Sequence, residues 1–142
     1  MTIKEIINQI GQKAKSSASK LSTIDSITKT EAIKKAARNI EINSHKIIQS
    51  NIIDVDNAKK NMLSNALIDR LILNPERIIS IKNSLIDIAK LPEPVGKILS
   101  EWERPNGLKI QKVSVPIGVI GVIYESRPNV TADASALGIK SG

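Results

Sequence analysis

The sequence predicts an α/β protein with a mainly helical amino-terminal part, one hairpin and a single strand-helix unit. Three observations support this fold class. Apolar residues recur at helical spacing through the first ninety residues. An Asn-Gly pair at residues 106–107 separates two strand-like runs, as a tight hairpin turn requires. Residues 119–124 (VIGVIY) form a near-continuous apolar run, which fits a strand buried on both faces.

Start signals divide the helical part. Residues 2–5 (TIKE) have the form of a capping box, with Ile3, Ile6, Ile7 and Ile10 following on one face. Residues 28–31 (TKTE) repeat the signal, and Ser44 and Ser64 precede further apolar runs. Asn74-Pro75 places a cap residue before a first-turn proline. We therefore expect helices to begin near residues 2, 28, 44, 64 and 74.

In the last third of the chain, the spacing of apolar residues is no longer helical. Two prolines and a glycine within residues 91–96 form a connector. Residues 97–102 and 108–115 are the expected hairpin strands, and residues 126–130 follow the apolar run as a loop. Thr131 is then expected to cap a helix over residues 132–140. A βαβ unit needs a second parallel strand, so we expect the unit that stops at Gly142 to be cut in half.

Composition restricts the chemistry. The chain has no cysteine, which excludes disulfides and a cysteine nucleophile. Its one histidine, His45, argues against a triad and against a histidine-based metal site, and we expect no metal. Catalysis by these residues alone would depend on hydroxyl, carboxylate or lysine side chains.

The charge and hydropathy patterns restrict the partners. The formal net charge is +7, but the lysines are scattered and only one Trp and one Tyr are present. A nucleic-acid interface usually clusters cations with stacking aromatic residues, so a solvated surface is favoured. No signal peptide and no apolar run of membrane-spanning length is found, so we expect a soluble, cytoplasmic protein.

Three motifs together resemble one enzyme family. Residues 115–142 (VPIGVIGVIYESRPNVTADASALGIKSG), 62–71 (MLSNALIDRL) and 92–99 (PEPVGKIL) are similar to γ-glutamyl phosphate reductases. The resemblance covers essentially the whole chain. It implies an aldehyde dehydrogenase-like fold, here incomplete: residues 1–96 as the helical part of a nucleotide-binding domain, 97–115 as an oligomerisation-arm-like hairpin, and 116–142 as the truncated start of the parallel unit.

The resemblance also implies an activity. The family reduces γ-glutamyl phosphate with NADPH to glutamate 5-semialdehyde and phosphate, in proline biosynthesis. A cysteine thiolate displaces phosphate before hydride transfer, and this chain has no cysteine. We therefore expect a truncated reductase that is inactive alone. A split reductase completed by another chain, and a non-catalytic basic module that binds anions or nucleic acid, are the alternatives. The partners considered besides the substrate are such a complementing chain or a homo-oligomer.

The resemblance places candidate site residues around the apolar run. Asn129 is the candidate oxyanion donor, against the alternative that it shapes a turn. Arg127, with Ser126, is the candidate for gripping the substrate's carboxylate or phosphate, against a structural ion pair. Ile123, Tyr124 and Glu125 are expected to line the cofactor groove through their backbone. Gly118 and Gly121 are interpreted as packing positions, and Lys140 as a cation at a helix end.

Overall fold

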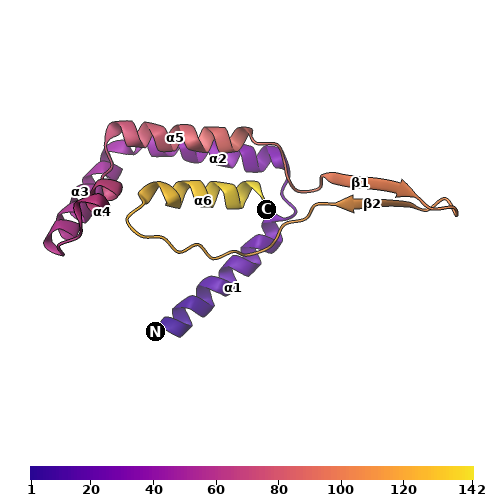
Figure 1. Ribbon diagram of the computed structural model, residues 1–142, viewed down its shortest axis with the longest axis horizontal. Helices are drawn as coiled ribbons and strands as arrows, with labels where there is room; N and C mark the ends of the chain where they lie inside the picture. Colours follow the sequence, from indigo (N-terminus) through magenta and orange to yellow (C-terminus); the bar gives the residue numbers. More distant parts are fainter.

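The structure, a computed structural model, describes all of residues 1–142. It contains six helices and one antiparallel hairpin, arranged as in Figure 1. In chain order these elements are α1 (Ile3–Leu21), α2 (Ser26–Ile42), α3 (Ser44–Lys60), α4 (Asn65–Leu71), α5 (Pro75–Lys90), β1 (Ile98–Glu103), β2 (Lys109–Val113) and α6 (Pro128–Lys140).

Side-chain caps fix most helix starts. Thr2 and Glu5 form the predicted capping box. Ser64 and Asn74 cap α4 and α5 as predicted, because each side chain accepts a hydrogen bond from a backbone N–H in the first turn of its helix. The start predicted at Thr28 is wrong. Asp25 accepts both the backbone N–H of Thr28 (2.8 Å) and its hydroxyl (2.6 Å), so α2 begins earlier, at Ser26. The same two bonds lower the pKa of Asp25.

The core lies where α2, α5 and α6 pack side by side (Figure 1). Full burial of an Ile or Leu side chain contributes about 1.5–3 kcal/mol, so this small cluster is the main apolar source of stability. Its buried members are Ile33, Ala37, Leu85, Ile88, Ala89 and Ala136.

Two buried lysines link these three helices, and one of them, Lys29, also contacts the connector. The Nζ of Lys29 lies 2.8 Å from Glu93 Oε1. Burial raises the pKa of Glu93, but hydrogen bonds donated by Lys29 and by the Val95 N–H outweigh it, and the net pKa is lowered. Lys140 donates to the hydroxyl of Thr30 (3.0 Å) and to the carbonyl of Ala89 (3.2 Å), near the end of α5. Lys140 thus caps a neighbouring helix rather than merely ending its own.

The hairpin predicted over residues 97–115 is confirmed. Trp102 pairs with Ile110, and the register shifts by one residue between Ile98 and Ser100. Gly107 has the expected positive φ (+81°), but Asn106 does not. The turn closes instead through the Arg104 N–H, which donates to the Leu108 carbonyl, and the Gly107 N–H, which donates to the Arg104 carbonyl. Figure 1 shows β1 and β2 extending beyond the helices, and their side chains are largely exposed.

The strand predicted over residues 119–124 is not formed. Residues 115–126 make no backbone-to-backbone hydrogen bond and run as a loop below α6 in Figure 1. A strand requires a neighbouring strand to pair its N–H and C=O groups, and the only strands of the chain, β1 and β2, pair with each other. The side chains of Val119, Ile120 and Val122 are about half exposed or more, and that of Ile123 is fully exposed.

Helix α1 buries none of its residues. It extends away from the core (Figure 1), so the face formed by Ile3, Ile6, Ile7 and Ile10 is exposed although its spacing is that of a packing face. No helix combines the length and apolar content needed to cross a bilayer.

Candidate functional site

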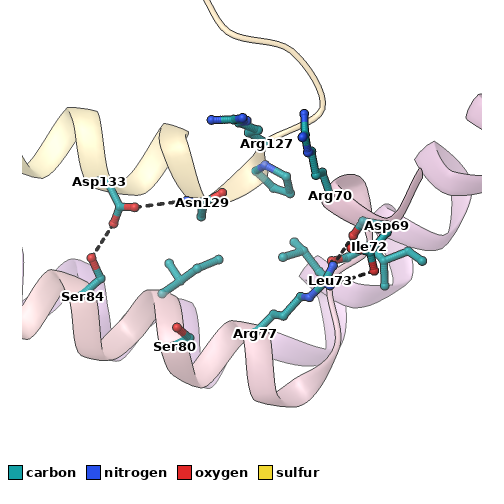
Figure 2. Close-up of a pocket in the computed structure, with 12 residues that line it drawn as sticks. Asp69, Arg70, Ile72, Leu73, Arg77, Ser80, Ser84, Arg127, Asn129 and Asp133 are labelled. Carbon is teal, nitrogen blue, oxygen red and sulfur yellow. Dashed lines mark hydrogen bonds and ion pairs between the residues drawn. The ribbon is translucent and has the colours of Figure 1, made fainter. Parts of the chain in front are cut away.

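A cavity of about 490 Å³ lies between α4, α5 and the start of α6. Figure 2 shows its mainly polar lining. Three arginines, two aspartates, an asparagine and two serines converge there above a few apolar side chains. The lining residues are Asp69, Arg70, Ile72, Leu73, Arg77, Ser80, Ile81, Ser84, Arg127, Pro128, Asn129 and Asp133.

The start of α6 brings two predicted site residues into this cavity. The helix begins at Pro128, whose missing N–H costs nothing at a first helical position. The start predicted at Thr131 is therefore wrong, and Asn129 lies in the first turn of α6 rather than in a loop. Arg127 precedes the helix and lines the cavity.

Arg77 has a structural role in the cavity wall. Its guanidinium donates to the carbonyl oxygens of Asp69 and Ile72 and lies 3.0 Å from the Asp69 carboxylate (Figure 2). These contacts satisfy carbonyls at the end of α4 and neutralise Asp69. Arg77 is thus committed to the turn between α4 and α5.

Asn51, which sequence reasoning missed, supports the same wall from behind. It is buried, donates to the carbonyl of Leu71 (2.8 Å) and accepts the N–H of Leu73 (2.6 Å). A signal was available in the sequence. Asn51 lies four residues before Val55 on the buried face of α3, and a polar residue on such a face needs a partner.

Arg127 and Arg70 are the two cations of the cavity whose guanidinium groups have no partner within the chain. Figure 2 shows Arg127 extending from the start of α6 and Arg70 from α4, at the same rim of the cavity. Neither guanidinium forms an ion pair or a hydrogen bond within the chain. The structural ion pair considered for Arg127 is therefore not formed. Two free planar donors beside the positive end of a helix favour a carboxylate or phosphate ligand.

A short polar chain crosses the inner side of the cavity. The hydroxyl of Ser84 on α5 donates to Asp133 Oδ1 (2.7 Å), and Asn129 Nδ2 donates to Asp133 Oδ2 (3.3 Å; Figure 2). Because a carboxylate only accepts hydrogen bonds, the amide nitrogen of Asn129 faces it. Because Nδ2 carries two N–H groups, one remains free for a ligand oxygen.

The other predicted residues do not line this cavity. The Tyr124 hydroxyl is 2.6 Å from the Thr131 hydroxyl. Ser126, with φ +52°, lines a second hollow of about 500 Å³ beside Tyr124 and Arg127. Glu125 is exposed, and Ile123 lines none of the larger cavities.

The two glycines of the loop, Gly118 and Gly121, have no neighbour that a side chain would displace. A Cβ atom added at Gly118 or Gly121 would meet nothing within 4 Å, so neither is a packing position here. This segment therefore forms no enclosed cradle for a dinucleotide. No group of three or more His, Cys, Asp or Glu side chains gathers where a metal could bind.

The known proteins that this chain resembles are reductases. It is 47% identical over 137 residues to the gamma-glutamyl phosphate reductase of Paramagnetospirillum magneticum, an alignment that covers 96% of this chain and 32% of that protein. It is also 47% identical over 139 residues to the Clostridium tetani reductase of that name (98% and 32%) and 53% identical over 131 residues to that of Nitratiruptor (92% and 32%). No protein-family model matches the chain.

Solved structures agree. The crystal structure of gamma-glutamyl phosphate reductase from Thermotoga maritima matches with a TM-score of 0.88 and 38% identity, over 92% of this chain and 31% of that one. The Saccharomyces cerevisiae enzyme matches with a TM-score of 0.88 and 34% identity, over 94% and 34%. The chain spans about a third of the length of its curated relatives. Nearly all of its own residues are homologous to gamma-glutamyl phosphate reductases, which confirms the resemblance and the fold class.

Proposed function

We infer that this chain forms the amino-terminal part of a γ-glutamyl phosphate reductase and supplies part of its substrate site. The proposed reaction reduces L-glutamate 5-phosphate with NADPH to L-glutamate 5-semialdehyde and phosphate, in proline biosynthesis. The observation that supports it most directly is the pair of free guanidinium groups, Arg127 and Arg70, at the rim of the cavity. They would hold the anionic acyl phosphate, and Ser126 would border it from the loop.

Asn129 is the proposed oxyanion donor. Its Nδ2 is oriented by Asp133, so a free N–H is preset before the substrate arrives. When an acyl carbonyl is attacked, negative charge grows on its oxygen, and a fixed donor is worth most at that moment. Arg127, two residues away, would stabilise the departing phosphate.

The chain offers no nucleophile for the acyl group. It contains no cysteine, and its one histidine lies on α3. Ser126, two residues before α6, forms no side-chain hydrogen bond that would activate it. A thiolate from outside residues 1–142 would have to form the thioester, and the chain contributes binding and orientation.

NADPH, when bound, would supply the hydride. Ile123, Tyr124 and Glu125 remain the proposed contacts, but they lie on an open loop and do not by themselves fit a dinucleotide.

A chimera tests the proposal. Residues 1–142 are joined to the unmatched part of the Clostridium tetani reductase, and NADPH formation from glutamate 5-semialdehyde, phosphate and NADP⁺ is followed. We expect activity in the chimera, its loss in the chimera carrying Arg127→Ala, and none in the 142-residue chain. A cooperatively folded but inactive chimera would contradict the function, and turnover by the isolated chain would contradict the need for an external thiol.

The exposed run at residues 117–124 favours a second form of the same function, in which another polypeptide pairs with it. The unmatched part of the relative, purified separately, would then restore activity when mixed with this chain. Activity in the fused chimera but not in the mixture would reject the split form.

A further inference from the structure

Asp133 is the one carboxylate in the cavity without a cationic partner. Asp69 is neutralised by Arg77, whereas Asp133 receives only neutral donors, the Ser84 hydroxyl and the Asn129 amide. A carboxylate has about four lone-pair sites, so roughly half of its accepting capacity is unused. Asp133 is half-buried, which makes an unpaired charge there more costly than on the open surface.

The charges of the cavity are therefore separated. Two cations, Arg127 and Arg70, lie at the rim, and one anion lies beside α5, as Figure 2 shows. A phosphate or dicarboxylate alone would satisfy the rim but would be repelled by Asp133. A ligand with an anion at one end and an ammonium at the other complements both.

We propose that Asp133 is a specificity-determining residue that binds the α-ammonium group of an amino-acid substrate, while Arg127 and Arg70 hold its acidic side chain. This inference rests on the proposed function and names the end of the substrate that function leaves unassigned. The apolar side chains of Ile81 and Leu73 also line the cavity and are suited to contact the methylene groups. Ser84 is a positioning residue, since its hydroxyl fixes one oxygen of Asp133.

Ligand preference tests the inference, because a purely structural Asp133 would not change it. The 142-residue chain is titrated by calorimetry with L-glutamate, with 4-aminobutyrate, which lacks the α-carboxylate, and with glutarate, which lacks the ammonium. The side-chain amide resonance of Asn129 reports whether each ligand occupies this cavity. We expect L-glutamate and 4-aminobutyrate to bind at least about tenfold more tightly than glutarate, as for one charge-assisted hydrogen bond.

Asp133→Asn keeps the shape and, through its one oxygen, the bond from Ser84, but it removes the charge and replaces the oxygen that accepts from Asn129 with an NH2 group. It should abolish the preference over glutarate, whereas Asp87→Asn, an exposed aspartate on α5 outside this cavity, should leave it intact. Glutarate binding as tightly as L-glutamate, an unchanged preference in Asp133→Asn, or no binding of any ligand would each overturn the inference. An active chimera beside such a result would leave the proposed function standing, and an inactive chimera with the preference intact would do the reverse.

Discussion

The core of α2, α5 and α6 and the loop of residues 115–127 use similar side chains with opposite outcomes. Ile33 is 1% exposed between helices, whereas Ile120 is 63% exposed on the loop. The difference lies in partners. A helix satisfies its own backbone and needs only a facing surface, whereas an apolar extended run also needs a neighbouring strand. Apolar composition therefore identifies residues suited to burial, and geometry decides which of them are buried.

The largest expected effect is the difference in unfolding free energy between an isoleucine truncated in the core and one truncated in the loop. Ile33→Ala should lower the free energy of unfolding by about 2–5 kcal/mol, since it leaves a cavity in the core. Ile120→Ala should change it by less than about 0.5 kcal/mol, because the side chain is already in solvent. Urea denaturation of both variants provides the measurement, and equal losses would show that the loop is packed in solution.

Glu93→Gln should lower the free energy of unfolding by about 1.5–3 kcal/mol at neutral pH, because Lys29 stays buried without its charged partner. The pKa of Glu93 is lowered in the folded state, so its stabilisation is complete above its ordinary value of 4.5 and disappears as pH falls through the lower folded value. The gap between wild type and variant should therefore close in acid. A gap that stays constant down to the acid transition would rule out this role.

Asn74→Ala should cost about 1 kcal/mol, since the Arg77 N–H at the start of α5 loses its acceptor. Thr28→Ala tests the corrected start of α2. It leaves the Asp25 bond to the backbone intact and should cost less than Asn74→Ala in thermal unfolding. The reverse order would restore Thr28 as the cap.

The smallest effect on stability accompanies a visible change in association. Ile120→Ser with Ile123→Ser should leave the melting temperature nearly unchanged and reduce self-association, because the exposed apolar run shrinks. Light scattering against concentration measures this, with Ile7→Ser on α1 as a matched exposed variant. A wild-type chain that is already monomeric would remove the basis of the prediction.

Most of the helices and the hairpin could be predicted from local sequence signals. Caps at Thr2, Ser64 and Asn74, and the Asn-Gly turn, depend on neighbouring residues and could be predicted. The start of α2 was missed because Asp25 accepts the backbone N–H and the hydroxyl of Thr28, which places Thr28 in the first turn of the helix rather than at its cap. The strand over residues 119–124 was predicted wrongly because strand pairing depends on residues distant in sequence.

The candidate site divides in the same way. The resemblance pointed to Arg127 and Asn129, which do line one cavity. Arg70 and Asp133 could not be assigned to it from sequence, since α4, α5 and α6 meet only through tertiary packing. The spacing of Asn51 on α3 indicates a polar residue that needs a partner, but not that the partner is the backbone at Leu71 and Leu73. A free arginine and a paired one, such as Arg70 and Arg77, look alike until their partners are located.

The most direct test of the anion site is calorimetric titration with glutarate, which carries no ammonium and isolates the arginines. Arg127→Gln and Arg70→Gln should each weaken binding at least about tenfold, the loss expected for one charge-assisted hydrogen bond. Arg104→Gln, on the hairpin turn, should bind as the wild type does. Unchanged affinity in Arg127→Gln would contradict the account.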